Sequence, residues 1–173
     1  PIKEDSPVAV KEIKAIGITP VMLTGDSAKT AEAVAGTIGI RKIISGVRPD
    51  QKLYEIQEYQ KKGISVGMVG DGINDAAALR AADLGIALGT GTDLSIESAD
   101  IIITSGRLTA VSDAIKISRA TYRKIRQNLF WAFIYNIIAI PAAVAGLLHP
   151  AIAEIAMILS SINVIINSMT IKK

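Results

Sequence analysis

The sequence predicts an α/β domain with a mainly parallel, doubly wound sheet, followed by a hairpin of two membrane-spanning helices. Residues 1–127 carry most of the charge and alternate strand-like with helix-like segments, which indicates parallel strands joined by crossover helices. The chain is 50% hydrophobic, and the excess apolar residues collect in its last third. We therefore expect a globular domain at 1–107, a basic helix at 108–128 and the hairpin at 129–173.

The first elements are predicted from apolar residues at helical or strand spacing. Residues 7–16 place valine and isoleucine on one face of a helix that ends at Gly17. Residues 18–23 are apolar enough for a buried strand, and an alanine-rich helix at 27–38 ends at Gly39. These segments form the first strand and the helices on either side of it.

The same alternation continues through the middle of the chain. A short strand at 43–44 precedes a helix at 50–62, which Pro49 opens and Gly63 closes. The apolar, β-branched residues at 64–69 indicate a strand buried in a parallel sheet.

The remaining globular segments are shorter. We expect a helix at 74–82 and strands at 84–88 and 101–104, with a small helix in the connection between those two strands. The GTGT sequence at 89–92 lacks the lysine of a phosphate-binding P-loop, so we interpret it as a turn.

Two apolar segments, at 129–148 and 151–169, are each about 20 residues long, which is enough to cross a bilayer. His149 and Pro150 form the short turn between them. Buried helices of a globular protein are the alternative, which the length and the flanking charges disfavour. Basic residues flank both outer ends and predict that these ends and the globular domain are cytoplasmic: Arg119, Arg123, Lys124, Arg126, Lys172 and Lys173.

Charge and cysteine content restrict the possible partners. The net charge of +3 is small, and the placement of the basic cluster fits a membrane surface better than a nucleic acid. Without cysteine, this chain has no thiolate metal site and no disulfide. The chain begins at Pro1 rather than at methionine, so we interpret it as a piece of a longer protein or a processed product.

The sequence VGMVGDGIND at 66–75 joins a predicted strand to two carboxylates. Asp71 and Asp75 lie four residues apart across the turn at Gly72, and Asn74 follows in the loop. Oxygen ligands beyond the carboxyl end of a strand suit Mg²⁺. The alternative is a turn aspartate and a cap on the following helix.

Two further polar groups follow other predicted strands. Thr24, Gly25 and Asp26 form a turn before a helix, where backbone amides bind anions readily. Lys52 lies in the first turn of a helix, where the helix dipole disfavours a cation, so its position indicates an anionic partner. A solvated lysine remains the alternative.

The motifs VMLTGD, RPDQK and VGDGIND occur in the order of haloacid-dehalogenase-like phosphoryl-transfer sites. Their residues resemble those of the phosphorylation domain of P-type ATPases. The resemblance implies that Thr24 and Gly25 hold the phosphoryl group, that Lys52 neutralises it and that Asp71 and Asp75 place Mg²⁺. It also implies ATP as the substrate of the full pump. Positioning and charge stabilisation are what phosphoryl transfer requires of a protein.

Polar residues within the two apolar segments carry a second resemblance, to the last two membrane helices of copper(I)-exporting heavy-metal ATPases. It implies a metal path along Tyr135, Asn136, Met157 and Ser160, in which the methionine thioether suits soft Cu⁺ or Ag⁺. Alternatively, these groups serve only to join the helices. The resemblance rests on Asn128, Tyr135, Asn136, Pro141, Met157, Ser160, Ser161 and Asn167.

The family's phosphorylated aspartate, in the sequence DKTGT, does not occur in the chain. We therefore expect that the chain alone neither hydrolyses ATP nor pumps. The favoured interpretation is the carboxyl-terminal part of a copper-exporting pump, whose partners are membrane lipid, the actuator, nucleotide-binding and earlier membrane segments, and a copper chaperone. The alternatives are a stand-alone membrane module that binds a pump or its other half, and a phosphatase-like protein, which the missing nucleophile disfavours.

Overall fold

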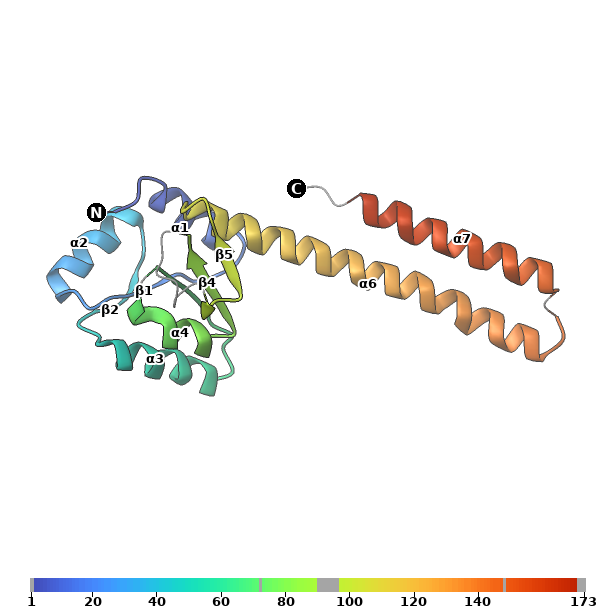
Figure 1. Cartoon of the computed structure of the whole chain (residues 1–173), viewed down its shortest axis with the longest axis horizontal. Helices are drawn as coiled ribbons and strands as arrows, with labels where there is room; N and C mark the ends of the chain where they lie inside the picture. The colour runs from blue at the N-terminus through green and yellow to red at the C-terminus, as the bar shows by residue number, and fades with distance from the viewer. Residues whose placement is uncertain (1, 72, 90–96, 148, 171–173) are drawn as a thin grey trace. The chain divides into compact units, whose positions relative to one another are not determined.

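A computed structural model of the chain describes residues 2–71, 73–89, 97–147 and 149–170 (Figure 1). The chain divides into two compact units, Pro1–Ala114 and Ile115–Lys173, which are described separately.

The first unit alternates helices and strands as the sequence predicts. Each strand is short, and the helices after β1, β2 and β3 return the chain to the start of the next parallel strand. The elements are α1 (Ser6–Ala15), β1 (Val21–Leu23), α2 (Ala28–Ile38), β2 (Lys42–Ile44), α3 (Pro49–Lys61), β3 (Gly67–Gly70), the 3₁₀ turn η1 (Ile73–Asp75), α4 (Ala76–Ala81), β4 (Leu84–Leu88), β5 (Ile101–Ile103) and the start of α6 (Thr109–Val144).

All strand pairs are parallel, but they form two separate sections. β1 pairs with β2, with Val21 opposite Lys42, and β3, β4 and β5 pair in that order. In the part of the chain that the structure describes, no strand joins β1 to β3. The parallel α/β fold is as predicted, whereas the single continuous sheet that we expected is divided in two.

Helices cover the strands on both sides. α1 contacts α2 on one side, and α3 contacts α4 on the other (Figure 1). The core is built mostly from small and branched aliphatic side chains, which let helices approach the short strands closely. Its buried members include Ala31, Ala35, Ile56, Ala78, Leu79, Ile86, Ala87, Leu88, Ile103 and Val111.

Two predicted strands start later than the sequence indicated. The first begins at Val21 rather than at residue 18, and the proline before it, Pro20, has no N–H to donate to a neighbouring strand. The third begins at Gly67 rather than at residue 64. Ile64 instead donates its N–H to the carbonyl of Tyr59 at 3.2 Å, so it belongs to the end of α3. A proline before β1 and the hydrogen bond at the end of α3 thus account for the two later starts.

The second unit contains the rest of α6 and α7 (Pro150–Met169), which run side by side in opposite directions (Figure 1). α6 continues through Pro141 to Val144. Both helices are long and apolar enough to cross a membrane. The most apolar stretch of 18 residues in each helix is 0% buried. A core helix of a soluble protein would be mostly buried, so the exposed apolar surface supports the membrane hairpin.

Some predictions fall outside the described residues. These are the turn residue Gly72, the small helix expected in the connection that includes 90–96, and the terminal lysines 172 and 173.

Candidate functional site

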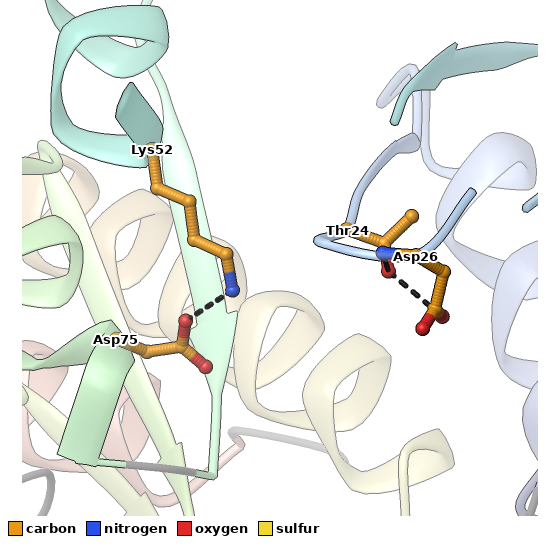
Figure 2. A network of polar contacts seen from close by, with 4 residues as sticks. All are labelled: Thr24, Asp26, Lys52 and Asp75. Carbon is orange, nitrogen blue, oxygen red and sulfur yellow. Dashed lines mark hydrogen bonds and ion pairs between the residues drawn. The ribbon is translucent and has the colours of Figure 1, made fainter. Parts of the chain in front are cut away.

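The turn after β1 is held by its own polar groups. Thr24 Oγ1 donates to Asp26 Oδ2 at 3.0 Å, and the Asp26 N–H donates to Thr24 Oγ1 at 3.2 Å (Figure 2). Ser27 then caps α2, because its hydroxyl accepts a hydrogen bond from the Thr30 N–H at 3.3 Å. The threonine hydroxyl and the turn amides therefore lie at the amino end of a helix, which favours anions.

The loop after β2 supports this turn. The Thr24 carbonyl accepts from the Val47 N–H at 3.1 Å, and the Asp26 carbonyl accepts from the Gly46 N–H at 2.9 Å. A Cβ on Gly25 would lie 3.4 Å from the Val47 carbonyl oxygen, so the two loops pack closely. Two backbone hydrogen bonds from the loop after β2 thus hold the turn in place.

Lys52 and Asp75 form an ion pair on the other section of the unit. Lys52 Nζ donates to Asp75 Oδ1 at 2.7 Å, and only 16% and 13% of the two side chains are exposed (Figure 2). The alternative of a solvated lysine is therefore wrong. The ion pair thus holds the partly buried Lys52 ammonium group beside the carboxyl end of β3.

The approach of Asp75 to β3 requires a glycine at position 70. A Cβ on Gly70 would lie 2.8 Å from Asp75 Cβ and 2.9 Å from Asp75 Oδ2, distances that real Cβ atoms do not show. Gly70 is the last residue of β3 and is itself buried. The glycine therefore lets the carboxylate lie directly over the strand end.

Asp75 does not serve as a helix cap. It occupies the N-cap position of α4, but its side chain accepts no capping hydrogen bond there. This excludes the cap as the reason for this carboxylate. Asp71 and Asn74 are exposed in the same loop. Among the described residues no three acidic or histidine side chains cluster, so any cation here would take further oxygen ligands from outside this set.

The predicted phosphate-binding residues thus form two pairs on different strand sections. Figure 2 shows Thr24 and Asp26 on one side of the view and Lys52 and Asp75 on the other. Hydrogen bonds exist within each pair and none is recorded between them in the described chain. The sheet places all four groups at carboxyl ends of parallel strands or on the helices that follow, where ligands bind in open α/β sheets.

One carboxylate near the site has a structural role. Asp83 Oδ2 accepts from the Val66 N–H at 2.8 Å, just before β3. This backbone hydrogen bond, with a smaller contribution from the Gln60 side chain, holds the pKa of Asp83 below its ordinary value. Asp83 therefore fixes the entry to the strand that carries Asp71 and Asp75 at its far end.

Two of the four predicted metal-path residues meet in the hairpin. Tyr135 and Ser160 line one cavity of about 280 Å³ between α6 and α7. The Tyr135 hydroxyl also donates to the Ala153 carbonyl at 2.8 Å. Asn136 and Met157 lie outside this cavity on exposed faces of their helices, and 57% of Met157 is exposed.

Sequence reasoning missed Asn163, which lines the same cavity. It could have been found as a polar residue in an apolar helix, three positions after Ser160, a spacing that places both side chains on one face of the helix.

A polar cluster joins the other end of the hairpin. Asn167 Nδ2 donates to Asn128 Oδ1 at 2.8 Å, and Lys124 Nζ donates to Asn167 Oδ1 at 2.9 Å. Asn128 Nδ2 also donates to Ser168 Oγ at 2.7 Å. These contacts give Asn128 and Asn167, two of the three asparagines of the membrane resemblance, a structural role in holding the helices together.

Comparison with known proteins extends over the whole chain. Residues 1–83 match a family described as haloacid dehalogenase-like hydrolase. The sequence is 51% identical over 172 residues to a copper-exporting P-type ATPase of Staphylococcus epidermidis, covering 99% of this chain and 22% of that protein. It is 50% identical to a probable copper-transporting ATPase, PacS, of Synechocystis, covering 99% of this chain and 24% of that protein. The chain spans less than a quarter of the length of these relatives.

Solved structures show the same architecture. A zinc-transporting PIB-type ATPase in its E2·Pi state matches 100% of this chain with a TM-score of 0.91 and 33% identity, and the chain covers 28% of it. The catalytic domain of the CPx-ATPase CopB-B matches 67% of this chain with a TM-score of 0.61 and 33% identity, and the chain covers 46% of it. The haloacid-dehalogenase-like fold expected from the three motifs is confirmed.

Proposed function

This chain belongs to the P-type ATPases, and we propose that it provides the phosphate and magnesium site and part of the metal path of a copper(I)-exporting pump, with silver(I) as a second cargo. The pump's remaining parts, which bind ATP and carry the nucleophile, are supplied by sequence that corresponds to the rest of the relatives. The chain alone has no ATPase activity.

One observation carries the phosphoryl part of the proposal, namely the ion pair between Lys52 and Asp75. A transferring phosphoryl group spreads negative charge over its oxygens, and a positioned cation stabilises that charge. Lys52 is held by α3 and by Asp75 in a partly buried position, so little reorganisation is needed when an anion arrives. Thr24 and Gly25 supply the hydroxyl and the amide for the same group.

The loop after β3 fits Mg²⁺ by its chemistry. Its donors are the carboxylates of Asp71 and Asp75, with the exposed amide of Asn74 in support, and hard oxygen donors are the ligands that Mg²⁺ prefers. Because Gly70 has no side chain, Asp75 can lie over the strand end. When bound, the cation would neutralise phosphoryl oxygens, while Lys52 neutralises others from the opposite helix.

The division of the sheet into two sections supports the proposal that a segment outside this chain supplies the nucleophilic carboxylate. Within the described residues β1 pairs only with β2, and β3 pairs only with β4, so β1 and β3 each have one edge without a partner. Parallel strands of α/β domains normally have partners on both edges unless they end the sheet. One additional parallel strand between β1 and β3 would complete it and would end between the Thr24 and Lys52 pairs, where a nucleophilic carboxylate is needed.

Neutral donors in the hairpin favour a soft monovalent cargo. Tyr135, Ser160 and Met157 offer hydroxyl and thioether ligands, and Glu154 is the only acidic residue in 115–173. A thioether suits Cu⁺, whereas Zn²⁺ in proteins is usually bound by imidazole, thiolate or carboxylate. Copper is also the cargo named for the relatives that are about half identical to this chain.

Zinc is the second candidate, because one structural neighbour is a zinc-transporting ATPase. A chimera can distinguish the two cargoes. In it, this chain replaces the homologous segment of the Staphylococcus epidermidis pump. We expect Cu⁺ and Ag⁺, and not Zn²⁺, to stimulate its ATPase activity. Met157→Ala should lower the copper stimulation about tenfold or more, whereas Met169→Ala, at the end of α7, should not. Stimulation by Zn²⁺ alone would overturn the copper assignment.

A further inference from the structure

We propose that Asn163 contacts the cargo ion directly and helps to select a monovalent metal. Its side chain lines the cavity of about 280 Å³ between α6 and α7 that Tyr135 and Ser160 also line. The ligand is Cu⁺ or Ag⁺, which neutral donors bind weakly as it passes. The inference rests on the proposed copper path, to which it adds a residue and a basis for selectivity.

Asn163 continues a row of side chains that begins at Met157. Met157, Ser160 and Asn163 follow one another at intervals of three residues, which is the spacing of one ridge on an α-helix. Because the helix rises about 1.5 Å per residue, neighbouring members of the row lie about 4.5 Å apart along the axis. An ion can therefore move from one donor to the next. Asn163 is the member nearest the cytoplasmic end of α7, so an exported ion meets it first.

The side chains of Ser160 and Asn163 differ from the other hydroxyl and amide side chains of α7 in their hydrogen bonds. Ser161 donates to a backbone carbonyl of its own helix at 3.0 Å, and Asn167 and Ser168 form hydrogen bonds with α6. Neither Ser160 nor Asn163 uses its side chain in a hydrogen bond with any residue that the structure describes. Lipid hydrocarbon offers no partner to a polar group, so these two side chains need a ligand from outside the hairpin.

The lining of the cavity favours a monovalent ion. No aspartate, glutamate, lysine or arginine is among the described residues that line it. A divalent ion would lose its hydration there without an anionic ligand to offset the cost, which is smaller for a single charge. Hydroxyl and amide oxygens can solvate a single charge, and Trp131 and Tyr135 add aromatic rings, whose faces attract cations. The neutral amide of Asn163 therefore contributes to discrimination against Zn²⁺.

The chain contains a fluorescent reporter of this cavity. Trp131 lines the cavity and is the only tryptophan of the chain, and no cysteine competes for metal. The full chain in phosphatidylcholine nanodiscs is titrated with Ag⁺ in nitrate buffer, since Ag⁺ quenches tryptophan fluorescence on close approach. We expect saturable quenching of Trp131 that an equal concentration of Zn²⁺ neither produces nor reverses.

Three variants test the role of the amide. Asn163→Ala should raise the dissociation constant for Ag⁺ about tenfold, the size expected when one polar contact to a charged group is lost. Asn163→Asp should let Zn²⁺ compete with Ag⁺, because a carboxylate supplies an anionic ligand that Zn²⁺ accepts. A purely structural role of Asn163 would not produce this gain. Ile162→Ala, at the adjacent position that does not line the cavity, is the control and should change neither property.

An affinity for Ag⁺ that Asn163→Ala leaves unchanged, or competition by Zn²⁺ in the unaltered chain, would overturn the inference. The chimera described above separates this failure from failure of the proposed function. There, Asn163→Ala should raise the Cu⁺ concentration for half-maximal ATPase activity about tenfold, and more than it lowers the maximal rate. An unchanged Cu⁺ requirement, with Met157→Ala still impaired, would exclude Asn163 from the path and leave the copper assignment intact. Stimulation by Zn²⁺ alone would instead overturn the copper assignment.

Discussion

Two lysines on α3 form ion pairs of the same length in different surroundings. Lys52 Nζ and Asp75 Oδ1 are 2.7 Å apart with side chains that are 16% and 13% exposed. Lys61 Nζ and Glu58 Oε1 are also 2.7 Å apart, but 65% and 30% of these side chains are exposed. Solvent weakens the second pair, whereas loss of one partner of the first leaves a charge that water reaches poorly.

Lys52→Met should therefore destabilise the loop after β3. The uncompensated Asp75 carboxylate should lower the local free energy of unfolding by about 1–3 kcal/mol, because it keeps its desolvation cost and loses its counter-charge. Hydrogen exchange of the full chain in detergent, followed by mass spectrometry, would show faster exchange in η1 and α4. Lys61→Met is the matched control and should leave exchange unchanged. Equal effects of the two substitutions would contradict this account.

The residues proposed for the phosphate site were chosen from the sequence, but their contacts could not be predicted from it. Thr24, Lys52 and Asp75 were found from three short motifs, each with a chemical reason for its residue types. The contact between Lys52 and Asp75 spans 23 positions and depends on how α3 lies beside β3, which no local pattern encodes. In the same way, Asn163 enters the cavity through the packing of α7 on α6.

At the scale of elements, one carboxylate fastens α1 to the start of α6. Asp5 Oδ2 accepts from the Thr109 N–H at 2.9 Å and from the Thr109 hydroxyl at 3.1 Å. The backbone hydrogen bond from Thr109 is the main cause that holds the pKa of Asp5 below its ordinary value of 3.8, and desolvation opposes it. The contact thus caps the first turn of α6 with a negative charge.

This contact should weaken in acid. Because the folded state lowers the pKa of Asp5, its stabilisation is fully present above the unfolded pKa and is lost as the pH falls below about 4 through the folded pKa. Hydrogen exchange at 109–113, corrected for the intrinsic pH dependence, should therefore accelerate between pH 5 and pH 3. Asp5→Asn should exchange at a nearly constant corrected rate over the same interval. A wild-type rate that shows no acceleration would contradict the role of Asp5.

The hairpin depends on the polar cluster at its cytoplasmic end. Asn167→Leu removes the acceptor of Lys124 and the donor to Asn128, and each interhelical hydrogen bond in a membrane is worth about 0.6 kcal/mol on average. We expect broader distances between α6 and α7, measured between spin labels on cysteines introduced at Ile125 and Met169 of this cysteine-free chain. Ser161→Ala, which loses only a bond to the Met157 carbonyl of its own helix, should keep the narrow distribution. An unchanged distribution in Asn167→Leu would refute this role.

Element types followed from periodicity more reliably than element ends. Apolar alternation and closing glycines predicted the order of helices and strands, because both depend on local backbone preferences. The start of β3 at Gly67 depends instead on the hydrogen bond of Ile64 to α3, and η1 precedes α4 where a regular helix was expected. Such ends depend on the hydrogen bonds that close each helix, which periodicity does not specify.

At the scale of the whole molecule, the sheet in two sections was the feature that the sequence did not predict. Alternating strands and helices indicate a parallel sheet but say nothing of the spatial order of its strands. The pairing of β1 only with β2, and of β3 only with β4, leaves one edge of β1 and one edge of β3 without a partner among the described strands. The absence of DKTGT from the sequence and these open edges are independent observations that lead to the same proposal.

The proposal that the nucleophile enters on a strand from elsewhere is tested most directly by finding which polypeptide becomes phosphorylated. This chain and the remainder of the Staphylococcus epidermidis pump are co-expressed as two polypeptides, and the membranes are treated with Cu⁺ and γ-labelled ATP. We predict an acid-stable label on the remainder that requires the presence of this chain, and none on the 18.2 kDa chain. Label on the 18.2 kDa chain, or equal label on the remainder without it, would contradict the account.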